Sequence, residues 1–465
     1  MSRTERLAEI IEQKRDLFIR ISDEIWDYAE TRYEEFKSAK LLCDTLENEG
    51  FRVEKGAAGI ETAFVGSWGS GKPVVAILGE YDALFGLSQH KEIAKQSPVD
   101  SKISGHGCGH NLLGTGALAA AVALRQYAEE NQLPGTIRYY GCPAEELGSG
   151  KTYMARAGLF NDVDFALTWH PAPYHGIMPS DSLANYQVYY KFKGRSTHAA
   201  GSPHLGRSAL DAVELMNVGS NYLREHIIPE ARVHYAVLNT GGNSPNVVQG
   251  EAEVLYMMRA PKIPQVQDIY ERVSNIARGA ALMTDTKVEI VFGKACSNLV
   301  RNTTLDMVMH RMYTELGVPG FDEHELQVAR DFRATLTEAD KQMKQYPELS
   351  NKELADVLLP YRPTATMSAS TDVGDVSWIT PTTECYCACT ALGTPFHSWQ
   401  MVAQGTTSFA HKGMLHAGKV IAATAVELMQ NPELLAKAKD ELKERLDGDV
   451  YVCPIPQDVQ PAVQR

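Results

Sequence analysis

Hydrophobic positions along the chain follow two different periods, which predict helices in some regions and strands in others. Apolar residues recur at helical spacing from Leu7 to Glu49 and from Leu112 to Glu129. The run from Val74 to Leu78 is apolar throughout, as in a strand buried on both faces. Further strands are predicted at 135–140 and 165–170, each leading into a polar turn. Strands that alternate with helices in this way predict an α/β fold with a mixed or parallel sheet covered by helices.

The pattern changes between residues 183 and 295, where strands of alternating hydrophobicity replace the fully apolar type. The predicted elements of this segment are strands at 186–192, 233–238, 252–258 and 288–292 and helices at 208–225 and 266–282. Their β-α-β-β-α-β order is that of a ferredoxin-like α+β fold. We therefore predict one domain formed by residues 1–182 and 296–465, with a second domain inserted at 183–295.

The C-terminal part resumes the first pattern. A helix is predicted at 305–316 and a long amphipathic one at 411–429, whereas 325–360 is charged and is interpreted as a peripheral insertion. Alternating thiols at Cys385, Cys387 and Cys389 indicate buried side chains on one face of a strand, with a cysteine-rich metal site as the alternative. Residues 450–465 contain three prolines and are expected to lack a core of their own.

Composition narrows the possible classes of protein. The 465 residues are 44% hydrophobic and 22% charged, which is typical of a globular protein with a sizeable core. A net charge of −13 argues against nucleic acid or an anionic membrane surface as a partner. The charged N-terminus has no signal-peptide pattern, and no apolar stretch suits a membrane span. Eight cysteines without paired spacing indicate reduced thiols and a cytoplasmic location.

The stretch from Gly105 to Asn111 is the clearest candidate for chemistry. It places the Cys108 thiol two residues from the His110 imidazole, among glycines and before an Ala-rich helix. The N-terminus of that helix should favour a thiolate, and Asn111 is a candidate cap for it. Thiolate and imidazole together are ligands for zinc or a similar divalent ion. The alternative is a redox cysteine beside a capping histidine.

Other candidate side chains follow predicted strands, where open α/β sheets place their sites. Glu80 and Asp82 follow the first buried strand, the Glu145-Glu146 pair follows the second, and His170 ends the third. A two-metal site is predicted from side chains that supply thiolate, imidazole or carboxylate, namely Cys108, His110, Glu146, His170 and His397. Glu145 would then be a free carboxylate that acts as general base. The alternative for the glutamate pair is two solvated side chains.

In these motifs the chain resembles the M20 metallopeptidases, specifically their amidohydrolase branch. The resemblance rests on Cys108-Gly109-His110, the Glu145-Glu146 pair, His170 and His397, and it implies a dinuclear-metal catalytic domain with an inserted lid or dimerisation domain. It implies that Glu145 is the base and Glu146 a ligand. The Gly194 to Ala199 segment matches a family motif whose histidine, here His198, reaches across a dimer to polarise the scissile carbonyl. Residues Asn246 and Arg259 match the family's binding residues for a substrate carboxylate.

Further stretches resemble a branch of that family that cleaves aminobenzoyl-glutamate, a product of folate breakdown. These stretches are 105–114, 201–212, 246–249, 370–378 and 411–414. The resemblance implies hydrolysis of p-aminobenzoyl-glutamate with two divalent ions, manganese first and zinc as the alternative. It also implies either a homodimer or a heteromer with a homologous A-type subunit. A broader N-acyl-amino-acid amidohydrolase or dipeptidase and a non-catalytic binding subunit are the other hypotheses. The family's common Asp-x-Asp motif is here Glu80-Tyr81-Asp82. Only Asp82 is therefore expected to have an outer-shell role, in which it orients a metal ligand without binding the metal itself.

Overall fold

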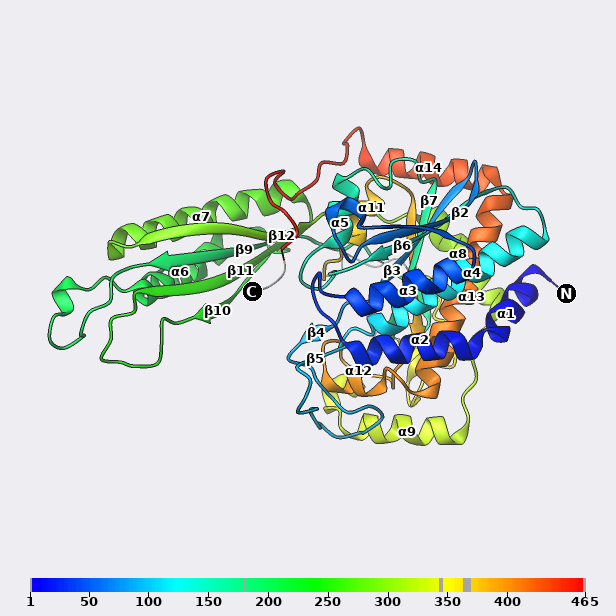
Figure 1. The fold of residues 1–465 in the computed structure, drawn as a ribbon, viewed down its shortest axis with the longest axis horizontal. Helices are drawn as coiled ribbons and strands as arrows, with labels where there is room; N and C mark the ends of the chain where they lie inside the picture. The colour runs from blue at the N-terminus through cyan, green and yellow to red at the C-terminus, as the bar shows by residue number, and fades with distance from the viewer. Residues whose placement is uncertain (1, 179, 343–345, 363–368, 463–465) are drawn as a thin grey trace.

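The computed structural model describes residues 2–178, 180–342, 346–362 and 369–462. The molecule is elongated, with a thick body from which one arm projects (Figure 1). The arm consists of strands β9 to β12 with helices α6 and α7, and the rest of the chain forms the body. Among the described residues, no helix combines the length and the apolar character needed to cross a membrane.

The body is built on a seven-stranded sheet. Its strands, in spatial order, are β1 Arg52–Lys55, β2 Phe64–Ser70, β6 Gly135–Cys142, β3 Val74–Glu80, β7 Phe165–Ala172, β13 Thr382–Ala388 and β8 Gly176–Ile177. Neighbours from β6 to β13 are parallel, whereas β1, β2 and β8 pair antiparallel at the edges. The predicted mixed α/β sheet is therefore confirmed. A separate two-stranded ribbon joins β4 Leu84–Phe85 to β5 Ser104–Gly105.

Helices cover both faces of this sheet. Side chains of β3 alternate between two apolar clusters, with Val75 and Ile77 in one and Val74, Ala76 and Leu78 in the other. The first cluster is closed by the longer helices, α1 Arg3–Gln13, α2 Arg15–Tyr28, α3 Phe36–Asn48, α4 His110–Glu130, α8 Thr303–Leu316 and α13 Ser408–Gln430. The second cluster packs α5 Gly150–Arg156 and α11 Val373–Ser377 and continues into the arm. The strand is buried on both faces, as its apolar run predicts.

Peripheral helices surround this frame. They are α9 Glu323–Ala334, α10 Glu338–Lys341, α12 Trp399–Gln404 and α14 Pro432–Leu446. The segment interpreted as a peripheral insertion nevertheless contributes to the core, because Ala329 and Phe332 on α9 are buried in the first cluster. The C-terminal tail is also anchored, since Ile455 is buried in the second cluster. The tail thus packs on a cluster formed by other segments, which agrees with a segment that lacks a core of its own. The insertion is less peripheral than its charge suggests, because its apolar residues find partners in the folded chain.

The arm contains a four-stranded antiparallel sheet in the order β10-β11-β9-β12. The strands are β9 Ala184–Lys193, β10 Arg232–Asn239, β11 Glu251–Ala260 and β12 Lys287–Cys296. Helices α6 Ala209–Leu223 and α7 Ile263–Thr284 lie along one face of this sheet (Figure 1). Element order and strand order together are those of the predicted ferredoxin-like plan. The domain bounds at 182 and 295 remain a prediction, although the arm's strands lie close to them.

Candidate metal centre and active site

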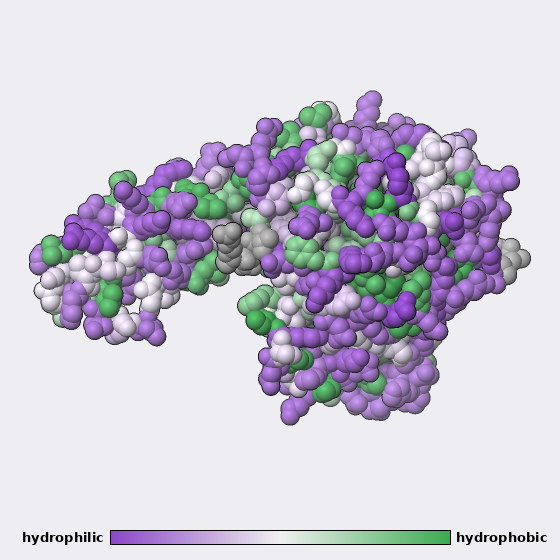
Figure 2. All heavy atoms as spheres, in the orientation of Figure 1, coloured by the Kyte–Doolittle hydropathy of each residue, from purple (hydrophilic) through white to green (hydrophobic). Residues whose placement is uncertain are grey.

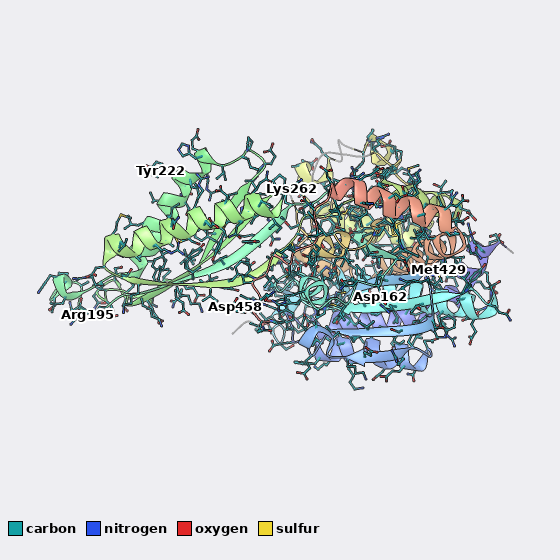
Figure 3. The ribbon with its side chains drawn as sticks, turned by 90° about the horizontal axis from the view of Figure 1, so that it is seen from above. Asp162, Arg195, Tyr222, Lys262, Met429 and Asp458 are labelled. Carbon is teal, nitrogen blue, oxygen red and sulfur yellow. The ribbon has the colours of Figure 1, made fainter. Side chains whose placement is uncertain are left out.

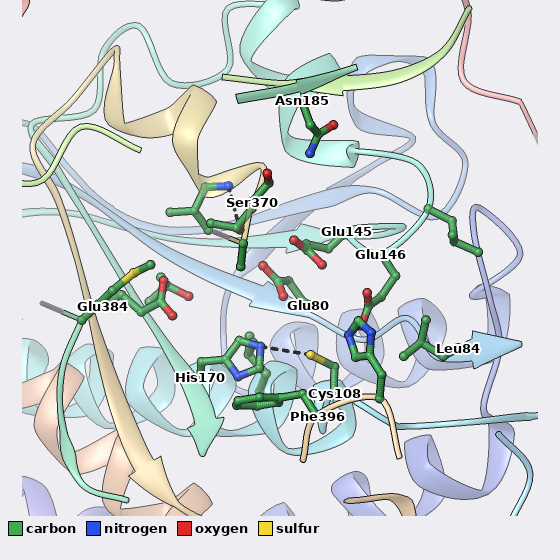
Figure 4. Close-up of a pocket in the computed structure, with 18 of the residues that line it drawn as sticks. Glu80, Leu84, Cys108, Glu145, Glu146, His170, Asn185, Ser370, Glu384 and Phe396 are labelled. Carbon is green, nitrogen blue, oxygen red and sulfur yellow. Dashed lines mark hydrogen bonds and ion pairs between the residues drawn. The ribbon is translucent and has the colours of Figure 1, made fainter. Parts of the chain in front are cut away.

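A pocket of about 500 Å³ opens where the body meets the arm. The carboxyl ends of β3, β6 and β7 supply Glu80, Glu145, Glu146 and His170 to its wall, as expected for an open α/β sheet. The loop before α4 adds Cys108, the loop after β13 adds Phe396 and His397, and the arm adds Asn185, Met257, Arg259 and Lys294. Figure 4 shows how these side chains converge from different elements. The predicted cluster of strand-end residues therefore exists.

The candidate ligands form two groups that share the Cys108 sulfur. In one group Cys108, His110 and His170 offer ligand atoms that all lie within 4.8 Å of one another. In the other, Cys108, Glu146 and His397 do the same. The Cys108 Sγ lies 3.4 Å from His170 Nε2, and His397 Nε2 lies 3.2 Å from Glu146 Oε1. A shared sulfur suits two ions about 3.5–4 Å apart, because a thiolate can donate to both.

Unsatisfied polar atoms at this place fit a bound cation. His110 Nε2 and Glu146 Oε1 are buried, and neither has a hydrogen-bond partner among the described residues. Each has a polar neighbour 3.2 Å away, Glu80 for His110 and His397 for Glu146, but in an orientation that makes no hydrogen bond. Leaving such atoms unpaired is unfavourable. Imidazole, thiolate and carboxylate donors directed at one space are what a divalent ion requires.

Groups behind these atoms fix their orientation. Asp82 Oδ1 lies 2.9 Å from His110 Nδ1, and its other oxygen accepts from the Glu146 backbone N–H at 3.0 Å. His170 Nδ1 lies 2.8 Å from the Pro171 carbonyl oxygen. In both histidines Nδ1 is thus engaged, and Nε2 is left free to bind an ion together with Cys108. Carboxylates and carbonyls commonly orient ligating histidines in this way. This is the geometry expected of Asp82.

The two adjacent glutamates have opposite electrostatic environments. Burial, together with the negative charges of Glu80 and Glu146, raises the pKa of Glu145 well above its ordinary value. Burial opposes ionisation of Glu146 as well, but the nearby His397 and the charge of His110 lower its pKa to about 2. Glu145 therefore favours the proton-bearing form and Glu146 the anionic form. Consecutive side chains of equal chemistry are thus suited to two different tasks.

The Cys108 side chain does not favour the thiolate form, although its place before the N-terminus of a helix predicts this. Burial first, and then the Glu146 carboxylate, raise its pKa well above the ordinary value. The field at the start of α4 is too weak to offset these effects, so the thiolate requires a cation beside it. The expected cap is also absent, because Gly109 occupies the N-cap position in a left-handed conformation. Asn111 lies inside the helix and donates instead to Ser22 Oγ and the Gly405 carbonyl.

A buried ion-pair network lies beneath the pocket. Lys151 Nζ lies 2.6 Å from Glu80 Oε1 and 2.5 Å from Asp372 Oδ1, and the Lys151 side chain is fully buried. Burial alone would lower the pKa of Lys151, but the two carboxylates raise it well above its ordinary value. A further donor group joins Glu80 and Glu145 to His110. Because Lys151 engages Glu80, we interpret Glu80 as part of this network rather than as a metal ligand. Only the Gly-Ser-Gly-Lys turn after the glutamate pair could have suggested this lysine.

The predicted substrate-binding residues are divided between two places. Arg259 lines the pocket, and its Nη1 donates to Ser370 Oγ at 2.8 Å. His198 and Asn246 lie on loops of the arm, where the Ala199 N–H donates to the Asn246 carbonyl oxygen. Figure 3 marks the neighbouring Arg195 at the tip of the arm, away from the body. Within one chain His198 and Asn246 are not among the residues that line the pocket. The action of His198 across a dimer and the binding of a carboxylate by Asn246 therefore stay predictions.

Comparison with known proteins places the chain in a family. The family model "Peptidase family M20/M25/M40" matches residues 76–450, which is most of the chain. This chain belongs to the M20 peptidase family. It is 50% identical to the B-type subunit of p-aminobenzoyl-glutamate hydrolase from Escherichia coli (strain K12), over 98% of each chain. Its identity to the Xaa-Arg dipeptidase of Mus musculus is 28%, over 96% of this chain and 93% of that protein.

A solved structure has the same fold. It is that of a dinuclear metal binding peptidase of the M20 family from Bacillus subtilis, with a TM-score of 0.56 and 16% identity. The match covers 90% of this chain and 99% of that chain. As a member of this family, the chain is a metal-dependent hydrolase, and two divalent metal ions are the expected complement.

Proposed function

We propose that this M20 protein hydrolyses the amide bond of an N-acyl amino acid, with p-aminobenzoyl-glutamate as substrate and p-aminobenzoate and glutamate as products. The observation that carries the reaction type is the pair of donor groups that share Cys108, beside a free Glu145 in one pocket. The substrate is suggested by the name of the Escherichia coli relative, which is similar over 98% of each chain.

The residues proposed to hold the two ions are Cys108, His110, Glu146, His170 and His397. The orphaned nitrogen of His110 and oxygen of Glu146 support this assignment, because a cation would satisfy both. Ions held there would polarise the amide carbonyl and lower the pKa of water towards neutrality. A donor set of mixed sulfur, nitrogen and oxygen accepts several metals. We propose manganese, with zinc as the alternative.

Glu145 is proposed to move the proton. It lines the pocket beside the proposed ligands, where burial and two carboxylates raise its pKa. Two cations held there would offset these effects and favour the anionic carboxylate, which could then accept a proton from the attacking water. The carboxylic acid that results can then donate this proton to the nitrogen of the leaving amine. One residue thereby serves both halves of the reaction, which a glutamate with an ordinary pKa would do less well.

Substrate binding is proposed to involve both the pocket and the tip of the arm. Arg259 lines the pocket and offers a planar fork that matches a carboxylate. Asn246 would assist this clamp, and His198 would stabilise the oxyanion, both from the arm of a second chain. Their position on the arm, outside the pocket of their own chain, supports a site that two chains complete together.

The second chain is proposed to be another copy or a homologous A-type subunit. The name of the Escherichia coli relative designates a subunit, which supports a heteromer. The described cysteines are free, in keeping with a cytoplasmic location. A dipeptidase activity is the second candidate function, because the Mus musculus relative carries that name.

The test is hydrolysis by the purified chain after removal and re-addition of metal. We expect release of p-aminobenzoate from p-aminobenzoyl-glutamate with manganese and its loss with chelator. A panel of acyl-amino acids and Xaa-Arg dipeptides run in parallel would detect the second candidate function. Metal binding without hydrolysis of any substrate, alone or with an A-type subunit added, would refute the proposed function.

A further inference from the structure

One carboxylate in the pocket has no partner that the reaction or the fold explains. Glu384 lies on β13, is 7% exposed and lines the pocket. Among the described residues its carboxylate makes no hydrogen bond or ion pair. In Figure 4 it lies across the pocket from Glu145 and Glu146, with Glu80 between them. An unpaired buried carboxylate is unfavourable, so a ligand group that could satisfy it must be considered.

Three buried carboxylates near Glu384 that lie outside the candidate metal centre are satisfied. Asp306 accepts from Thr383 Oγ1 at 2.6 Å and from Tyr361 OH at 2.7 Å. Asp375 accepts from Thr152 and Ser297, and Asp372 is paired with Lys151. Glu384 therefore differs from these neighbours in its contacts rather than in its depth. Its side chain faces the substrate space instead of a protein partner.

The strand register gives the distance of Glu384 from the candidate metal centre. Tyr386 is paired with His170 on β7, and Glu384 is paired with Thr168, two residues earlier in each strand. Two strand residues span about 6.6–6.8 Å, and side chains two apart lie on the same face. A benzoyl group has a comparable length from its carbonyl carbon to its para substituent. An acyl group whose carbonyl lies near His170 would therefore bring a para substituent close to Glu384.

Two aromatic side chains beside His170 form part of the pocket wall and suit an aromatic ring. Tyr386 and Phe396 line the pocket, with ring centroids 6.4 Å and 5.5 Å from that of His170. Arg259 offers a cation to a substrate carboxylate and Glu384 offers none, so the amino-acid end belongs near Arg259. Burial first, and then the Glu80 charge, raise the pKa of Glu384 to about 8. With or without its proton, the carboxyl group keeps an oxygen that can accept an N–H bond from a neutral amine.

We propose that Glu384 recognises an amine on the acyl group of the substrate by accepting a hydrogen bond from its N–H. Glu384 thereby selects amine-bearing acyl groups over unsubstituted ones. This inference rests on the proposed function. The amine could be the arylamine of p-aminobenzoyl-glutamate or the ammonium of a dipeptide, and the chemistry that Glu384 offers is common to both. The residue would determine specificity and would take no part in bond cleavage.

The test compares kcat/KM for matched substrate pairs in wild type and Glu384→Leu. The aryl pair is p-aminobenzoyl-glutamate and benzoyl-glutamate, and the dipeptide pair is alanyl-glutamate and propionyl-glutamate. For one of the two pairs, we expect the ratio of kcat/KM for the amine-bearing substrate to kcat/KM for the unsubstituted one to fall by about 10- to 100-fold in Glu384→Leu. Glu384→Gln keeps an acceptor oxygen and should retain most of the arylamine preference. Asp306→Asn, a buried carboxylate that already has partners, is the matched control and should leave both ratios unchanged.

A binding measurement separates this inference from the proposed function. Calorimetry with the metal-loaded protein should show p-aminobenzoate binding more tightly than benzoate, with the difference lost in Glu384→Leu. A fall in the aryl ratio identifies the arylamine as the partner, and a fall in the dipeptide ratio identifies the ammonium. Hydrolysis with both ratios unchanged in Glu384→Leu would overturn the inference and leave the proposed function intact. Absence of hydrolysis in wild type refutes the proposed function instead, and equal binding of the two acids would then refute the inference too.

Discussion

The body and the arm contribute to the candidate active site in contrasting ways. In the body, donor atoms from separate loops and strands lie within 4.8 Å of one another in each group and are supported by Asp82 and by Lys151 beneath them. At the tip of the arm, the His198 imidazole accepts from the N–H groups of Ala200 and Gly201, and its backbone pairs with Val247 of the same arm. Figure 2 shows the arm projecting from the body with mostly hydrophilic residues at the surface.

This difference indicates what each part requires. The candidate metal centre is assembled by one chain, because the core of the body holds its donors in place. The tip of the arm can take part only if a second chain, or a movement of the arm, brings it to a pocket. Substitutions in the body and in the arm therefore test the two halves separately.

Glu145→Gln should lower kcat by about 10²- to 10⁴-fold, because the amide cannot accept the proton. Metal content and thermal stability should stay near wild type, since Glu145 is not among the proposed ligands. The matched variant Glu146→Gln should instead lose metal. Steady-state kinetics and metal analysis on the same preparations check this. Near-wild-type activity in Glu145→Gln would show that another group is the base.

Lys151→Met should destabilise the body by about 3–5 kcal/mol, because Glu80 and Asp372 would lose their shared cation while remaining buried. Chemical denaturation of the purified variant measures this. Lys40→Met is the matched control, since Lys40 is exposed and pairs with Asp44 one helical turn away. That control should change stability by no more than about 0.5 kcal/mol. Equal effects in the two variants would contradict the interpretation of the buried network.

His198→Ala should lower kcat by about 10²- to 10³-fold if its side chain stabilises the oxyanion. Metal content should not change, because the residue lies outside the pocket of its own chain. Mixing this variant with Glu145→Gln is the sharper measurement. If His198 acts across a dimer, mixed dimers contain one intact site and activity returns. Failure of the mixture to regain activity, with mixed dimers shown to form, would place His198 in its own chain's site.

Arg259→Ala should raise KM by about 10- to 100-fold for substrates with a free carboxylate, through loss of a charged hydrogen bond. An analogue with its α-carboxylate amidated provides the control and should respond far less. Kinetics on the two substrates measure the difference. A loss of the same size on both would mean that Arg259 supports the pocket through Ser370 and does not clamp the carboxylate.

Local pattern alone determined much of this protein. The apolar run that became β3, the helical repeat that became α4 and the alternating strands of the arm are consequences of side-chain period, which each segment carries by itself. The candidate ligands could likewise be named, because their chemistry and their positions after strands are visible in the sequence. Strand ends are brought together by any parallel sheet, so the cluster around Cys108 followed from the topology.

Tertiary structure alone decided what depends on neighbours distant in the chain. The pairing of Lys151 with Glu80 and Asp372, the unpaired state of Glu384 and the opposite pKa shifts of Glu145 and Glu146 have no local signal. The same is true of Asn111, which lies inside α4 and is satisfied by Ser22 and Gly405 rather than by a helix terminus. Burial and Coulomb interactions fall off over a few ångströms, and only the fold determines which groups come that close.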